Sequence, residues 1–219
     1  PRHITRILML LRANALAKGY SGIRISTVQL LLDMLNMDIV PVLPSQGSVG
    51  SSGDLVQLAH LVTGMMGLAK CWRSDGGTEA SGEALQRAGL TPVVLAAKEG
   101  LALINGTQMM TAYLTFTTSR AMSLMKQVDI AGSMSLEALL GTTNACDPLL
   151  HAVRPHPGQQ AVARNILRIL ADSDIRASHL LDHDVEVAAA VAIAEIDLGA
   201  EAARIGAAAR GLHLGAGAV

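Results

Sequence analysis

The sequence predicts an all-α protein, a long-helix bundle that carries one Gly/Ser-rich loop. Hydrophobic residues make up 50% of the chain and aromatic residues only 2%, so the core must be built from Leu, Ala, Ile, Val and Met, which suit helices better than sheets. Apolar residues recur three and four positions apart, and no series of strands is evident. A chain of 219 residues is long enough for one sizeable domain or two small ones.

Two helices are predicted before the loop. Residues 2–18 carry apolar residues at helical spacing, and Gly19 follows as a C-cap. Ser26, with Gln29 three residues later, fits a capping box at the start of a second helix that ends near Met37. The prolines that come next favour an extended connector into the loop.

A third helix is predicted directly after the loop. Asp54 can cap this helix, so that the positive end of the helix dipole would face the loop. The predicted buried side of the helix consists of Leu55, Leu58, Leu61, Val62, Met65 and Met66. Residues 73–82 are the most loop-like stretch of the chain, and a short helix over residues 83–88 ends at Gly89.

The second half of the chain predicts further helices. A long helical zone runs from Leu95 to about Gln127, and another element covers residues 135–140. Prolines punctuate a turn region over residues 148–157, and a helix follows over about residues 159–170.

Composition argues against several kinds of partner. The net charge is −1 and aromatic residues are few, so neither a phosphate backbone nor stacked bases would be recognised and no nucleic acid is expected. The longest uncharged stretch, Gly100–Ser119, is interrupted by Asn, Gln and Thr, which predicts a buried helix rather than a membrane span.

The cysteines and histidines predict no metal site. Cys71 and Cys146 are far apart, and the seven histidines form no closely spaced pair. The two cysteines are typical of reduced thiols in a cytosolic protein. The opening Pro-Arg-His-Ile-Thr-Arg is not typical of a secretory signal, so a cytoplasmic location is predicted.

The most informative stretch is residues 47–60, which read Gly-Ser-Val-Gly-Ser-Ser-Gly-Asp-Leu-Val-Gln-Leu-Ala-His. Its glycines leave the backbone few steric limits. In a very tight turn the Gly53 nitrogen could attack the Ser51 carbonyl carbon, and Ser52 could lose its hydroxyl as water. The product would be 4-methylidene-imidazol-5-one (MIO), an electrophile formed autocatalytically without an external cofactor. The alternative is an ordinary Gly/Ser loop before a helix.

This stretch resembles the core motif of the aromatic amino-acid ammonia-lyases. The usual form of that motif is Gly-Ser-Val-Gly-Ala-Ser-Gly-Asp-Leu-Ala-Pro-Leu-Ala-His. Ser51 stands where the family has Ala, and Val56 and Gln57 stand where it has Ala-Pro. Because only the carbonyl of Ser51 would enter the ring, that replacement leaves the backbone chemistry possible.

A second stretch, residues 98–108, reads Lys-Glu-Gly-Leu-Ala-Leu-Ile-Asn-Gly-Thr-Gln. It is similar to the family's Lys-Glu-Gly-Leu-Ala-Leu-Leu-Asn-Gly-Thr-Gln, and the ending Gly-Thr-Gln favours the histidine-specific branch. The resemblance implies that Asn105 lies beside the ring and helps to hold the substrate, for which an amide offers both a donor and an acceptor. The alternative is that Asn105 and Gly106 merely break or kink a buried helix.

The resemblance implies a carbon–nitrogen lyase of the histidine type, which eliminates ammonia from an aromatic amino acid and converts histidine to urocanate. Ser51, Ser52 and Gly53 would be the catalytic precursor of the MIO group, Asn105 would bind the small-molecule substrate, and Asp54 would support the turn. A simple N-cap role for Asp54 is equally open. The family forms homotetramers of long helices with shared active sites. The alternative for the whole chain is an inactive fragment, or a helical scaffold or assembly subunit.

The resemblance predicts two segments. An ammonia-lyase-like partial domain covers residues 1–180, and an Ala/Gly-rich divergent tail covers residues 181–219. The family's substrate-contacting Tyr and Arg segment has no counterpart in the tail, and its upstream Tyr base and imidazole-recognising His are not matched either. The expectation is therefore a chain truncated at both ends, with a truncated or frame-shifted tail.

Overall fold

A computed structural model describes residues 1–178 of the chain, which fall into two compact units. The first unit comprises Pro1–Phe116 and the second begins at Thr117. Helix α6 (Gln108–Ala138) contributes residues to both units. The predicted boundary at residue 180 and the tail that follows it lie outside the described residues.

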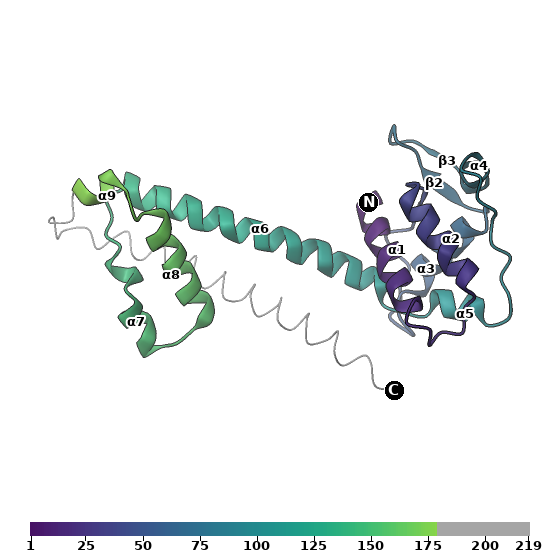
Figure 1. Cartoon of the computed structure of the whole chain (residues 1–219), viewed down its shortest axis with the longest axis horizontal. Coiled ribbons are helices and arrows are strands. Elements are labelled where there is room, and N and C mark those ends of the chain that lie inside the picture. The colour runs from purple at the N-terminus through teal and green to yellow at the C-terminus, as the bar shows by residue number, and fades with distance from the viewer. Residues whose placement is uncertain (179–219) are drawn as a thin grey trace. The chain divides into compact units, whose positions relative to one another are not determined.

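Helices dominate the first unit, which confirms the predicted all-α class. Besides the start of α6 they are α1 (Arg2–Leu16), α2 (Ile25–Asn36), α3 (Leu55–Met65), α4 (Ser81–Arg87) and α5 (Glu99–Ile104). Figure 1 shows α1 and α2 side by side. Aliphatic and methionine side chains form the core, and the fully buried ones include Leu8, Met9, Leu31, Met34, Leu58, Leu61, Met65, Leu85 and Leu103.

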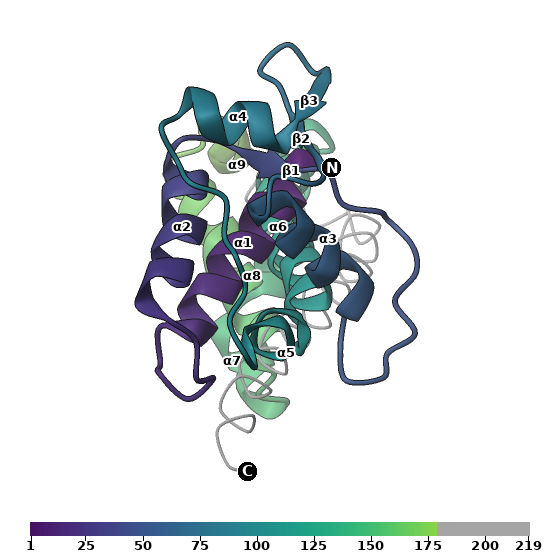
Figure 2. The same ribbon diagram turned by 90° about the vertical axis from the view of Figure 1, so that its right-hand side faces the viewer.

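A small antiparallel sheet accompanies these helices, in the order β1 (Val40–Pro41), β2 (Lys70–Trp72) and β3 (Thr78–Ala80). Figure 2 shows the sheet next to α4. No series of strands was evident in the sequence, because strands of two and three residues are too short to show an alternating pattern.

The predicted capping box of the second helix is wrong. Helix α2 begins at Ile25 with Arg24 at the N-cap, so Ser26 already lies inside the helix. The Gln29 side chain donates instead to Asp33, at 2.8 Å. A carboxylate from α5 takes the place of the local cap, because it accepts hydrogen bonds at the start of α2.

The predicted long helical zone from residue 95 is interrupted. The chain leaves helix α5 at Asn105 and enters α6 at Gln108, which then continues to Ala138 and includes part of the predicted element at residues 135–140. The interpretation of Asn105 and Gly106 as a helix break therefore holds for the backbone.

The second unit packs the later part of α6 with four short elements, which are η1 (Asn144–Cys146), α7 (Pro148–Val153), α8 (Pro157–Ile169) and α9 (Asp174–Ser178). Its buried core consists of Cys146, Ala163, Ile166 and Leu170. Helix α7 forms where only a turn region was predicted. Pro148 occupies its first position, where no amide donor is needed, and the Asp147 side chain caps it by accepting from the Leu149 amide at 2.8 Å.

Within residues 1–178, none of the helices combines the length and the apolar character needed to cross a membrane. Over the same residues, no group of three or more His, Cys, Asp or Glu side chains is arranged to hold a metal ion.

Gly64 of α3 packs against β1 and offers a test of this packing. A Cβ atom at position 64 would lie 2.6 Å from Cγ of Pro41. Gly64→Ala should therefore lower the free energy of unfolding by about 1–3 kcal/mol, although alanine is the better helix former. Gly100→Ala in α5 is the matched control, because a Cβ there meets no atom within 4 Å and stability should be unchanged or slightly raised. Denaturant unfolding of both variants measures the difference, and equal stabilities would contradict it.

Candidate active site

The connector from β1 to α3 contains the Gly/Ser-rich loop, visible as a long loop beside α3 in Figure 2. Its φ angles are positive at Gly47 (112°), Gly50 (71°), Ser52 (59°) and Gly53 (98°). A left-handed conformation at a non-glycine residue such as Ser52 costs about 1–3 kcal/mol. Ser51 and Ser52 are exposed and Gly53 is half-buried. The three residues predicted to form the ring therefore lie in a strained turn that solvent can reach.

The two sequence motifs meet at a pair of glycines. Gly53 and Gly106 form an isolated parallel β-bridge, and the Asp54 amide donates a hydrogen bond of 2.7 Å to the Gly106 carbonyl. A Cβ atom at position 53 would lie only 2.1 Å from that carbonyl oxygen. Glycine is therefore required at position 53 by this close approach as well as by its positive φ.

Asp54 is buried and its carboxylate joins the loop to α6. Although Asp54 holds the N-cap position of α3, its side chain makes no capping hydrogen bond there, so the predicted cap of α3 is wrong. One carboxylate oxygen accepts from the Met110 amide in the first turn of α6 at 2.9 Å, and the other accepts from the Ser48 hydroxyl at 3.2 Å. The negative charge thus lies at the N-terminus of α6, where the helix dipole favours it.

Asn105 immediately precedes the glycine that contacts the loop. Its side chain is exposed, and its amide nitrogen donates to the Leu101 carbonyl at 3.3 Å. The amide oxygen of an exposed Asn can accept a hydrogen bond from a ligand. Its substrate-binding role stays a prediction.

Arg12 of α1 lies behind the second motif, and the sequence reasoning missed it. Its guanidinium donates to the carbonyl oxygens of Asn105 (2.8 Å) and Ala102, and to Oε1 of Gln108 (3.1 Å). Only 4% of Arg12 is exposed, and burial lowers the pKa of its guanidinium. Arg12 continues the apolar stripe of Ile4 and Leu8 at a spacing of four, and a charge in such a stripe is the signal that could have revealed it.

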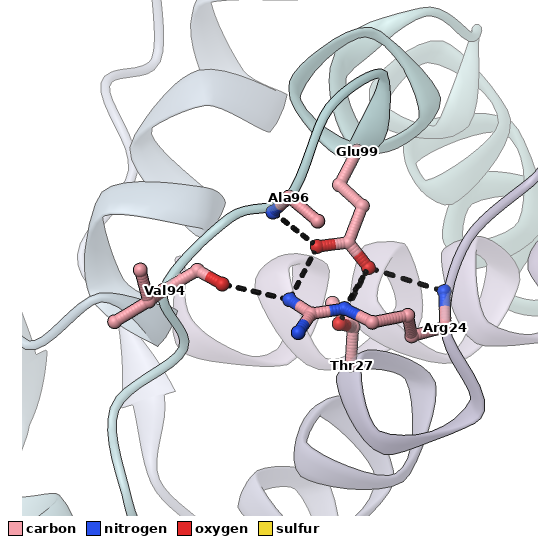
Figure 3. A network of polar contacts seen from close by, with 5 residues as sticks. All are labelled: Arg24, Thr27, Val94, Ala96 and Glu99. Carbon is pink, nitrogen blue, oxygen red and sulfur yellow. Dashed lines mark hydrogen bonds and ion pairs between the residues drawn. The ribbon is translucent and has the colours of Figure 1, made fainter.

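Glu99 anchors the other end of α5, as Figure 3 shows. Its buried carboxylate accepts from the backbone amide, Nε and Nη2 of Arg24, from the Thr27 hydroxyl and from the Ala96 amide. Arg24 also donates to the Val94 carbonyl at 2.7 Å. The hydrogen bond from Arg24 lowers the pKa of Glu99 well below its usual range, although desolvation by burial opposes this shift. Both ends of α5 are therefore held by long-range polar contacts.

Gln57 occupies the position at which the resembling motif has Pro. The residue is buried in the first turn of α3, and its side-chain nitrogen donates to the Gln46 carbonyl at 3.2 Å. Within the described part of the chain its Oε1 has no hydrogen-bond partner. Gln57 therefore ties the beginning of the loop to α3, which a proline could not do.

A cavity of about 570 Å³ lies elsewhere in the first unit, at the end formed by the sheet and α4. Charged side chains around it include Arg2, Asp38, Arg73, Glu79 and Arg87. None of the predicted site residues lines it. The site is identified by the contact between the two motifs and not by this cavity.

Known proteins match the part of the chain that contains both motifs. The family model described as "Aromatic amino acid lyase" matches residues 1–193, which extends beyond residue 180, where the resemblance was expected to end. The histidine ammonia-lyase of Myxococcus xanthus (strain DK1622) is 54% identical over 175 residues, which are 80% of this chain and 34% of that protein.

Two solved structures resemble the chain in fold. The crystal structure of histidine ammonia-lyase from Trypanosoma cruzi has a TM-score of 0.74 at 41% identity, covering 81% of this chain and 35% of that one. Pantoea agglomerans phenylalanine aminomutase has a TM-score of 0.73 at 37% identity, covering 78% and 33%. The chain thus spans about a third of the length of the curated relatives it matches.

Proposed function

The chain belongs to the aromatic amino acid lyase family, and on this basis we propose that it supplies the electrophile-forming part of a histidine-type ammonia-lyase. The reaction is the elimination of ammonia from an aromatic amino acid, with histidine giving urocanate. The observation that carries the proposal is the close approach of Gly53 to the Gly106 carbonyl, which supports a tight turn at Ser51, Ser52 and Gly53.

The residues of the turn have the chemistry that ring closure needs. The Gly53 nitrogen forms a bond to the Ser51 carbonyl carbon, and the carbonyl oxygen leaves as water with the protons of the Gly53 and Ser52 amides. Ser52 then loses its α-proton and its hydroxyl as a second water. The strained φ of Ser52 and the absence of a Cβ at Gly53 both favour a compressed turn.

Neighbouring residues support this assignment. When formed, the MIO group supplies an electrophile that activates the amino-acid substrate for loss of ammonia. Asn105 lies next to the Gly53 contact, and we assign its exposed amide to the substrate. Asp54 holds the turn through the Ser48 hydroxyl and the Met110 amide, and is therefore a supporting residue.

We also assign the assembly and location implied by the family. Apolar side chains of α6, namely Met122, Leu124, Ile130 and Met134, are each more than half exposed in the isolated chain. Exposed apolar surface of this extent favours association, which agrees with a homotetramer whose active sites are shared between subunits. The buried free thiols of Cys71 and Cys146 agree with a cytoplasmic location.

The intact mass of the purified chain tests the proposed electrophile. We expect a mass lower than the sequence mass by two waters. Ser52→Ala should abolish the loss of the water that creates the alkene. Ser51→Ala should still lose both waters, because only the backbone carbonyl of residue 51 takes part. An unmodified wild-type mass would contradict the proposal and favour a scaffold or an inactive fragment.

A further inference from the structure

The geometry assigns a second role to Arg12, one that rests on the proposed function. We propose that Arg12 is a positioning residue, which holds the Gly106 carbonyl against the Gly53 and Asp54 backbone and thereby sets the geometry in which the ring closes.

Two groups of atoms lie close to Gly106. On one side, its carbonyl accepts the Asp54 amide and approaches Gly53 too closely for any side chain there. Elsewhere on the same residue, a Cβ atom would lie 2.6 Å from Nη1 of Arg12 and 2.1 Å from Oε1 of Gln108. Arg12 and Gln108 therefore crowd the α-carbon of the same residue whose carbonyl contacts the loop.

Arg12 joins the end of α5 to the beginning of α6. Helix α5 has only six residues, and its last carbonyl groups lack partners within the helix. Arg12 satisfies the carbonyls of Ala102 and Asn105, and the same guanidinium reaches the side chain of Gln108, the first residue of α6. It therefore fixes the irregular backbone of residues 105–107 from both ends, and places a cation where the α5 dipole is negative.

Packing alone does not explain an arginine at this position. An apolar side chain would continue the Ile4 and Leu8 stripe without burying a charge. Among the described residues, Arg12 has no carboxylate partner and its Nε has no hydrogen-bond acceptor. Burial of the guanidinium therefore costs free energy. In return, its hydrogen bonds fix the position of the Asn105 and Gly106 backbone.

The test compares Arg12→Met with Arg12→Lys and two controls, all in the full chain. Arg6→Met removes an exposed arginine from the same helix, and Leu85→Ala weakens the core of the first unit far from the loop in sequence.

Two quantities are measured for each variant. The first is the rate at which two waters are lost, from intact mass over time, and the second is the protection of the Asp54 amide in hydrogen exchange. Arg12→Met should slow ring formation at least tenfold and remove the protection, and Arg12→Lys should fall between Met and the wild type.

The controls separate positioning from general stability. Arg6→Met should behave as wild type, and Leu85→Ala should keep its rate of ring formation although it unfolds more easily. Equal rates and equal Asp54 protection in Arg12→Met and Arg6→Met would overturn the role of Arg12, as would a loss of rate in Leu85→Ala that matches Arg12→Met. If the wild-type chain forms no ring, the proposed electrophile fails. In that case the role of Arg12 is tested by hydrogen exchange alone, and unchanged protection of the Asp54 amide in Arg12→Met would show that Arg12 does not position Gly106.

Discussion

Gly53→Ala is expected to abolish ring formation, so that the intact mass equals the sequence mass. The alanine nitrogen remains a competent nucleophile, but its Cβ would lie 2.1 Å from the Gly106 carbonyl oxygen and the residue would have to keep a φ of 98°. The Asn105 and Gly106 backbone and the turn must then move apart. We also expect the free energy of unfolding to fall by about 2–4 kcal/mol, from backbone strain and overpacking together.

Gly50→Ala is the matched control for this change. Gly50 lies in the same loop with a φ of 71°, but a Cβ there meets no atom within 4 Å. Both variants therefore carry the cost of an alanine with a positive φ, but only Gly53→Ala adds a clash with the Gly106 carbonyl. Gly50→Ala should therefore still lose two waters, and a Gly53→Ala chain that loses them as fast as Gly50→Ala would show that the contact with Gly106 does not matter.

Glu99→Gln is expected to cause a large loss of stability although it lies away from the loop, about 3 kcal/mol. The carboxylate of Glu99 receives only donors, and Ala96 N and Arg24 Nη2 both point at the same oxygen. A glutamine must present an NH₂ group to some of these donors, which leaves buried groups unsatisfied. Glu79→Gln is the control, because its partner Arg87 is mostly exposed and a solvent-exposed ion pair contributes little to stability.

The effect of Glu99 should also depend on pH. Its pKa is lowered in the folded state from the ordinary 4.5, so the ionised carboxylate contributes stability that is fully present above about pH 4.5. That contribution is lost as the pH falls through the folded-state pKa. Denaturant unfolding from pH 7 down to pH 3 should therefore show the wild type and Glu99→Gln converging below about pH 4.5. A constant difference across this range would contradict the assignment of the stability to the Glu99 charge.

The sequence was sufficient where the information is local. Ser51, Ser52 and Gly53 are consecutive, so the motif and the family resemblance were enough to predict a self-attacking turn, and that chemistry stays a prediction. The helices α1 and α3 were also predictable, because their apolar residues repeat at helical spacing over three turns or more. Strands of two or three residues carry no such period, which is why the sheet was missed.

The sequence was insufficient where a contact joins distant segments. Arg12 reaches Asn105 across 93 positions, and Glu99 reaches Arg24 across 75. Capping its own helix was one of the two roles predicted for Asp54, and it is the local one. The fold instead brings α6 to the Asp54 carboxylate, which accepts from the Met110 amide. Such pairings depend on how helices pack, and no spacing rule within one helix predicts them.

The meeting of Gly53 with Gly106 has a consequence during protein synthesis. A ribosome makes the Ser51, Ser52 and Gly53 turn well before it makes the segment that presses on it. A nascent chain that ends before Gly106 lacks the carbonyl that accepts the Asp54 amide, so this contact can form only after the second motif has been made. Under the proposed chemistry, the reactive group would therefore arise only in molecules that have already folded. The chain would then carry no electrophile while its thiols and amines are still exposed. The loss of two waters would irreversibly mark the molecules that have folded correctly.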